Sequence, residues 1–73
     1  MKTIGIRGDH IKLDSFLKFS GIAETGGEAK RLVASGIVLL NGAPCLERGK
    51  KIKPGDIVKI QDFEYLITTE EDI

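Results

Sequence analysis

The chain has 73 residues, 41% of them hydrophobic and 30% charged, with no net charge. This length predicts a single domain, residues 1–73, and the periodic blocks of apolar residues exclude a wholly disordered chain. The longest apolar run, residues 37–40, is too short to cross a membrane. Residues 1–10 lack the apolar stretch of a secretory signal, and the single cysteine, Cys45, can form no internal disulfide. We therefore expect a cytoplasmic protein without membrane contacts.

The charges are unevenly distributed along the chain. Residues 1–60 hold all 11 basic residues but only six of the 11 acidic ones, a balance of +5. Residues 61–73 hold five acidic residues and no basic one. A basic body favours a polyanionic partner. The acidic end, which we take as a tail over residues 68–73, either meets a partner or only aids solubility.

The first part of the chain predicts a short strand and a helix. Residues 2–6 alternate weakly, as a short strand does, and residues 7–10 form a turn. Leu13, Phe16, Leu17 and Ser20 then follow the spacing of an amphipathic helix. Gly21 suits the position just after a helix end, so this helix is expected to stop there.

A second helix follows after a short link. Thr25 is a plausible N-cap and Glu28 stands three positions later, the pattern of a capping box. Between them lie two glycines, Gly26 and Gly27, at the first two helical positions. Together with the first helix, this segment predicts an αα-hairpin that ends at Gly36.

Strand signals dominate the rest of the chain. Residues 37–40 predict a strand, and the Asn41-Gly42 pair is typical of a hairpin turn. Pro44 argues against a regular central strand, so the returning strand is expected to be an edge strand or irregular. Residues 47–51 read as a basic loop, Pro54-Gly55 as a type II turn, and residues 57–60 and 63–68 as two further strands.

No arrangement of residues predicts catalysis or a cofactor. His10 is the only histidine and has no obvious partner, and Cys45 has neither a second cysteine nor a nearby histidine. A zinc site needs about four ligands. A Walker A loop fails because Lys51, instead of Ser or Thr, follows Gly49-Lys50. We therefore expect no enzyme activity, cofactor, metal or small-molecule substrate.

Two groups of basic residues are the candidates for binding. Lys30 and Arg31 lie one turn after Gly26 and Gly27, where a helix start without side chains offers free N–H groups to an anion. The glycines alternatively serve only a tight turn or a close helix contact. The second group lies on a loop, and its alternative is an ordinary solvated surface; it consists of Arg48, Lys50, Lys51 and Lys53.

The aromatic residues are too few for a platform on which successive bases stack. The chain has three phenylalanines, one tyrosine and no tryptophan. Contacts with a nucleic acid are therefore expected to involve phosphates and shape, which suits folded RNA.

The order of these parts resembles the S-four RNA-binding domain, named for ribosomal small-subunit protein four. The resemblance covers about residues 12–60 and lies in "KLDSFLKFSGIAETGGEAKRLVASGIVLLNG" and "GKKIKPGDIVKI". It implies an α+β fold, in which an αα-hairpin packs on a small antiparallel β-sheet (the alpha-L motif). It also implies a free-standing protein that binds structured RNA, ribosomal or transfer RNA, in ribosome assembly or translation.

Within this resemblance, Lys12 stands where an arginine is common, before the Leu13-Asp14 pair. The family pattern Ser-Arg-x-Glu-Ala of the second helix carries an arginine thought to touch RNA. Glycines replace it here, as in the short bacterial members of the YaaA type. The residues expected to contact RNA are Lys12, Lys18, Gly26, Gly27, Lys30, Arg31, Arg48, Lys50, Lys51 and Lys53. The alternative function is a protein-interaction adaptor, with a protein partner that meets the segregated charges.

Overall fold

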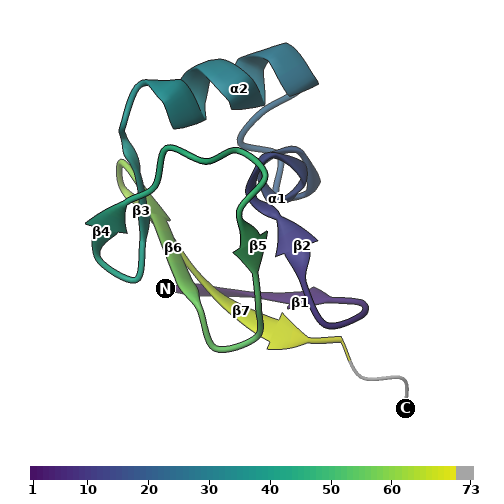
Figure 1. Cartoon of the computed structure of the whole chain (residues 1–73). Coiled ribbons are helices and arrows are strands. Elements are labelled where there is room, and N and C mark those ends of the chain that lie inside the picture. The colour runs from purple at the N-terminus through teal and green to yellow at the C-terminus, as the bar shows by residue number, and fades with distance from the viewer. Residues whose placement is uncertain (71–73) are drawn as a thin grey trace.

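The computed structural model describes residues 1–70. Two short helices lie against strands that form a main sheet and a separate two-stranded ladder (Figure 1). In chain order the elements are β1 (Lys2–Ile6), β2 (Ile11–Lys12), α1 (Leu13–Phe19), α2 (Gly26–Ala34), β3 (Val38–Leu40), β4 (Ala43–Pro44), β5 (Lys51–Ile52), β6 (Ile57–Ile60) and β7 (Phe63–Thr69). Neither helix of this part of the chain is long and apolar enough to span a membrane.

The main sheet has the strand order β1-β7-β6-β3-β4. The pairs β3–β4, β3–β6 and β6–β7 are antiparallel, whereas β1 pairs with β7 in parallel, from Lys2 opposite Tyr65 to Ile6 opposite Thr69. The α+β fold with its αα-hairpin is confirmed, but the sheet is mixed and not wholly antiparallel. The whole body of the chain connects β1 to β7, and this long connection permits the parallel pairing.

The end of the chain also differs from the expectation. β7 continues to Thr69, and the N–H of Glu70 donates to the carbonyl of Ile6 at 2.8 Å. Residues 68 and 69 therefore belong to the sheet and not to a tail. The rest of the expected tail, residues 71–73, lies outside the described residues.

The helices begin and end where their local signals place them. Leu13, Phe16 and Leu17 of α1 are fully buried, as their spacing predicts. The Thr25 hydroxyl accepts a hydrogen bond from the Glu28 N–H at 3.1 Å, which confirms Thr25 as the N-cap of α2. Gly21 follows α1 with φ of +85°, a conformation that most side chains disfavour.

The αα-hairpin lies beside the strands (Figure 1), and buried apolar residues from the helices and the strands form one hydrophobic core. Phe16 of α1 meets Tyr65 of β7 edge to face, with ring centroids 5.5 Å apart. The buried apolar residues are Ile6, Leu13, Phe16, Leu17, Ala23, Ala29, Val33, Val38, Ile52, Val58, Ile60, Tyr65 and Ile67.

The small ladder of β2 and β5 was not predicted. Ile11 pairs with Ile52 and Lys12 with Lys51, so the loop expected over residues 47–51 ends in a strand. The same segment binds the start of α1, because the carbonyls of Lys50 and Arg48 accept hydrogen bonds from the N–H groups of Leu13 and Asp14, each at 2.9 Å. These carbonyls satisfy N–H groups that a side-chain cap satisfies in other helices, and α1 has no such cap.

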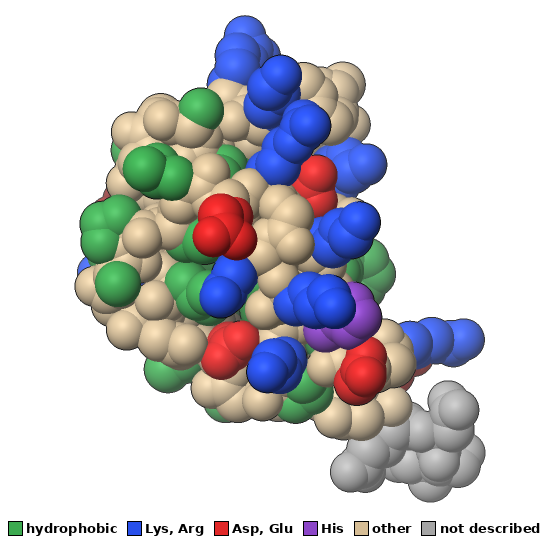
Figure 2. Space-filling model, viewed as in Figure 1, with side chains coloured by type: hydrophobic (Ala, Val, Ile, Leu, Met, Phe, Trp, Pro, Cys, Tyr) green, Lys and Arg blue, Asp and Glu red, His purple; other side chains and the backbone are tan. Residues whose placement is uncertain are grey.

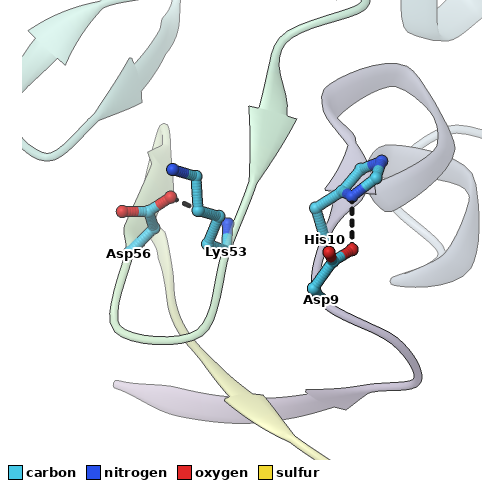
Figure 3. A network of polar contacts seen from close by, with 4 residues as sticks. All are labelled: Asp9, His10, Lys53 and Asp56. Atoms are coloured by element: carbon cyan, nitrogen blue, oxygen red, sulfur yellow. Dashed lines mark hydrogen bonds and ion pairs between the residues drawn. The ribbon is translucent and has the colours of Figure 1, made fainter.

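Asn41 connects the two turns of the sheet. It takes φ of 52°, and Gly42 follows with 88°, which confirms the predicted hairpin turn. The Asn41 side chain accepts from the Ile57 N–H at 2.8 Å and donates to the Asp56 carboxylate at 3.1 Å. That carboxylate also accepts from the Lys53 N–H at 2.9 Å, across the Pro54-Gly55 turn (Figure 3).

Replacing Asn41 by alanine should lower the free energy of unfolding by about 2–5 kcal/mol. The loss combines two hydrogen bonds, at about 0.5–1.5 kcal/mol each, with the cost of a left-handed conformation for alanine. The control is Asn41→Gly, which loses the same bonds but takes a positive φ freely. Urea unfolding of both variants separates the two contributions. Equal losses in the two would contradict a conformational cost at this position.

Candidate nucleic-acid interface

The residues predicted to contact RNA are all exposed. Within residues 1–70, Arg7 is the only Lys or Arg that pairs with a carboxylate, that of Glu70 at 3.4 Å. The other basic side chains therefore lack an acidic partner in this part of the protein. Positive charge that the fold does not neutralise is available to an external anion.

The ladder of β2 and β5 brings together basic residues that are far apart in the sequence. Lys12 lies directly opposite Lys51, and the backbone of Arg48 and Lys50 is bonded to the start of α1. We call Lys12, Arg48, Lys50 and Lys51 the basic cluster. Like charges directly opposite each other destabilise a strand pair, so a bound anion would relieve this repulsion.

The basic side chains form a band on one face of the molecule. Figure 2 shows Lys and Arg side chains from the level of α2, at the top, to the level of β2 and β5 below. A few acidic side chains lie among them. The cations of the helical hairpin and those of the ladder thus share one face, which the sequence alone could not show.

The two glycines of α2 have no packing role in the described structure. A Cβ atom added at Gly26 would meet nothing within 4 Å, and one at Gly27 only the Thr25 hydroxyl at 3.9 Å. Neither residue is in the left-handed region. The explanation by a close helix contact is therefore wrong. Within residues 1–70 their N–H groups have no hydrogen-bond partner and face solvent at the helix start.

Asp9 and His10 form a pair in the turn before β2. The His10 Nδ1 atom lies 2.7 Å from the Asp9 carboxylate (Figure 3). This hydrogen bond and the charge of His10 lower the pKa of Asp9, with a smaller effect of Lys51. His10 thus has a partner that the sequence analysis did not recognise. No group of three metal-binding side chains occurs in the part of the chain that the structure describes.

A family model described as S4 domain matches residues 4–68. The chain belongs to the S4 domain family. It is 38% identical over 60 residues to the "Probable ribosome maturation protein RlbA" of Bacillus subtilis, covering 82% of this chain and 84% of that protein. It is 37% identical over 51 residues to the "Small ribosomal subunit protein uS4" of Polynucleobacter asymbioticus, covering 70% of this chain but only 25% of that protein. The resemblance seen in the sequence is confirmed, and the match extends to β1 and β7.

Several residues that carry the S4 pattern hold the fold together. Leu13 and Ala29 are fully buried. Asp14 is half-buried, and its carboxylate accepts from the Ser15 N–H at 2.7 Å. Asn41 is bonded to Asp56 and Ile57. In this S4 domain, these motif residues build a scaffold and the exposed cations lie on its surface.

Proposed function

We propose that this S4 domain is a non-enzymatic protein that binds folded ribosomal RNA during ribosome maturation in the cytoplasm. Its S4 family and its similarity to a ribosome maturation protein and a ribosomal protein support RNA binding at a general level. The more specific proposal, that the protein binds folded RNA, rests on one observation. The basic cluster has no acidic partner within residues 1–70 and shares a face with the cations at the level of α2 (Figure 2).

Recognition through phosphates and shape suits this surface. Cations neutralise phosphates and release counterions, which makes the affinity depend on salt. Double-stranded RNA is read mainly through its backbone, its 2′-hydroxyls and its shape. The proposed phosphate contacts are the basic cluster together with Lys18, Lys30, Arg31 and Lys53, all of which are exposed.

A filter-binding titration tests this proposal. Ribosomal RNA fragments and transfer RNA are titrated with the protein at 50 and 200 mM salt. We expect tighter binding to ribosomal RNA and a clear loss of affinity at the higher salt. No affinity for either RNA at 50 mM salt would overturn the proposal. A clear preference for transfer RNA would show that transfer RNA, and not ribosomal RNA, is the bound class. The adaptor alternative depends partly on acidic residues outside residues 1–70, and no structural observation favours it.

The glycines of α2 provide a test in which stability and binding change in opposite directions. Gly26→Ala and Gly27→Ala should each raise the free energy of unfolding by about 0.5–1 kcal/mol, because alanine favours the helix and meets no clash. If a phosphate contacts the exposed backbone, the same variants should bind RNA less tightly.

Urea unfolding and the RNA titration measure the two effects. The matched control is Ala34→Gly at the exposed end of the same helix, which should lose about 1 kcal/mol and keep its RNA affinity. Unchanged RNA affinity in both glycine variants would remove Gly26 and Gly27 from the interface.

A further inference from the structure

A hollow of about 630 Å³ lies between the αα-hairpin and the turn that joins β6 to β7. Its apolar lining includes Ile22, which follows α1, Leu32 of α2 and Phe63 of β7. This volume is in the range of about 300–1,000 Å³ that small-molecule sites occupy. This hollow could not be predicted from the sequence, because its walls come from four separate parts of the chain.

An exposed aromatic ring lines this hollow. Phe63 is 48% exposed, whereas its neighbour Tyr65 is only 5% exposed. The two rings are nearly parallel, at 16°, with centroids 6.5 Å apart. Tyr65 is in turn packed against Phe16 of the core. Phe63 is therefore supported on one side by a fixed ring, while about half of its surface is open to a ligand.

Polar and cationic groups surround the aromatic ring. Arg31 of α2 and Lys2 of β1 both line the hollow, and so does Gln61 of the β6–β7 turn. Gln61 takes φ of 53°, a left-handed conformation that is rare for a residue other than glycine. It belongs to the two-residue turn between Ile60 and Phe63, whose hairpin geometry takes a positive φ at the first position. The hollow thus combines a stacking surface, an amide that can bond to a base edge, and two cations.

We propose that the hollow binds one unpaired nucleobase of the bound RNA, stacked on Phe63. This inference rests on the proposed function and adds to it the class of RNA that is preferred: a helix with a bulged or looped-out nucleotide. Arg31 and Lys2 would hold the phosphates that flank this nucleotide, while Gln61 contacts its edge. A single base needs only one exposed ring, so the small number of aromatic residues is no obstacle.

The charge of the hollow favours a nucleotide over an apolar protein side chain. Its cations, Arg31 and Lys2, outnumber its one carboxylate, that of Glu28. Arg31 also belongs to the helix that carries Lys30. RNA that contacts Lys30 therefore lies on the same helix that lines the hollow.

The test uses two RNA hairpins with the same stem, one fully paired and one with a single bulged adenine. The protein should bind the bulged hairpin at least about 5-fold more tightly, the lower end of what stacking of one base contributes. Phe63→Leu should abolish this preference and keep the affinity for the paired hairpin. The matched control is Phe19→Leu, which alters a phenylalanine that is 62% exposed and lies outside the hollow; it should keep the preference.

Methyl NMR locates the bound base. Signals of Ile22 and Leu32 should shift strongly with the bulged hairpin and weakly with the paired one. Those of Leu46, which is 66% exposed, outside the hollow and two residues before Arg48, should shift equally with both hairpins. Equal affinity of wild type for both hairpins, or an unchanged preference in Phe63→Leu, would overturn the inference while leaving the proposed function intact. Such a result would favour a protein side chain as the occupant. Failure of both hairpins to bind would overturn both proposals.

Discussion

Replacing both Lys12 and Lys51 by alanine is expected to weaken RNA binding about 30-fold at 0.1 M salt while the protein remains folded. The log of the affinity changes by about 0.7–0.9 per phosphate contact for each tenfold change in salt. Each contact therefore contributes about 5- to 8-fold between 1 M and 0.1 M salt. The salt slope should fall by about 2, one unit for each lysine.

This pair is a sharp test because its effect on stability has the opposite sign. Lys12 and Lys51 lie directly opposite each other in the β2–β5 ladder, with no acidic partner within residues 1–70. Removing like charges in this position should leave the stability unchanged or raise it by about 0.2–1 kcal/mol. A lower affinity in this variant thus cannot be explained by unfolding.

The matched control is Arg7→Ala with Lys59→Ala, which changes the net charge by the same amount. Arg7 already pairs with Glu70, and Lys59 lies on β6, opposite Leu39 and Glu64. This control should lose less than about 3-fold in affinity, because only long-range attraction is reduced. Equal losses in the two double variants would show that net charge, and not the basic cluster, determines binding.

Replacing Phe16 by alanine should lower the free energy of unfolding by about 3–5 kcal/mol. Phe16 is fully buried in the core and meets Tyr65 at 5.5 Å. A domain of this length has a total stability of about 4–11 kcal/mol, from about 0.05–0.15 kcal/mol per residue. The variant is therefore expected to lose a large part of its stability, which a lower midpoint of urea unfolding would reveal.

The control for this prediction lies on the same helix. Phe19 is 62% exposed, so Phe19→Ala should change the stability by less than about 1 kcal/mol. A loss of under 1 kcal/mol in Phe16→Ala would contradict the placement of the core between α1 and β7.

Local signals were sufficient for the helical hairpin and the turns. The spacing of Leu13, Phe16 and Leu17 and the cap at Thr25 act within one or two turns of helix, so they can be read from neighbouring residues alone. The Asn41-Gly42 turn likewise depends on the backbone preferences of two residues. The order of these helices, turns and strands along the chain was enough to recognise the S4 family.

The sequence predicted which residues could belong to the candidate site, but not how they are arranged. The sequence indicated which residues are basic, and they are all exposed. It could not show that Lys12 lies beside Lys51, because each strand of that ladder has only two residues, too short for a periodic pattern. The one sequence signal for this ladder was Ile52, a single apolar residue between two lysines. In the structure, Ile52 is a fully buried strand residue.

The sequence by itself thus determined the hairpin, the turns and the identity of the basic residues, because those depend on neighbours within a few positions. Tertiary structure decided the parallel pairing of β1 with β7, the ladder that assembles the basic cluster and the hollow beside Phe63. Each of these joins segments that are far apart in the sequence. Their positions follow from the burial of one common core, and no local preference encodes them.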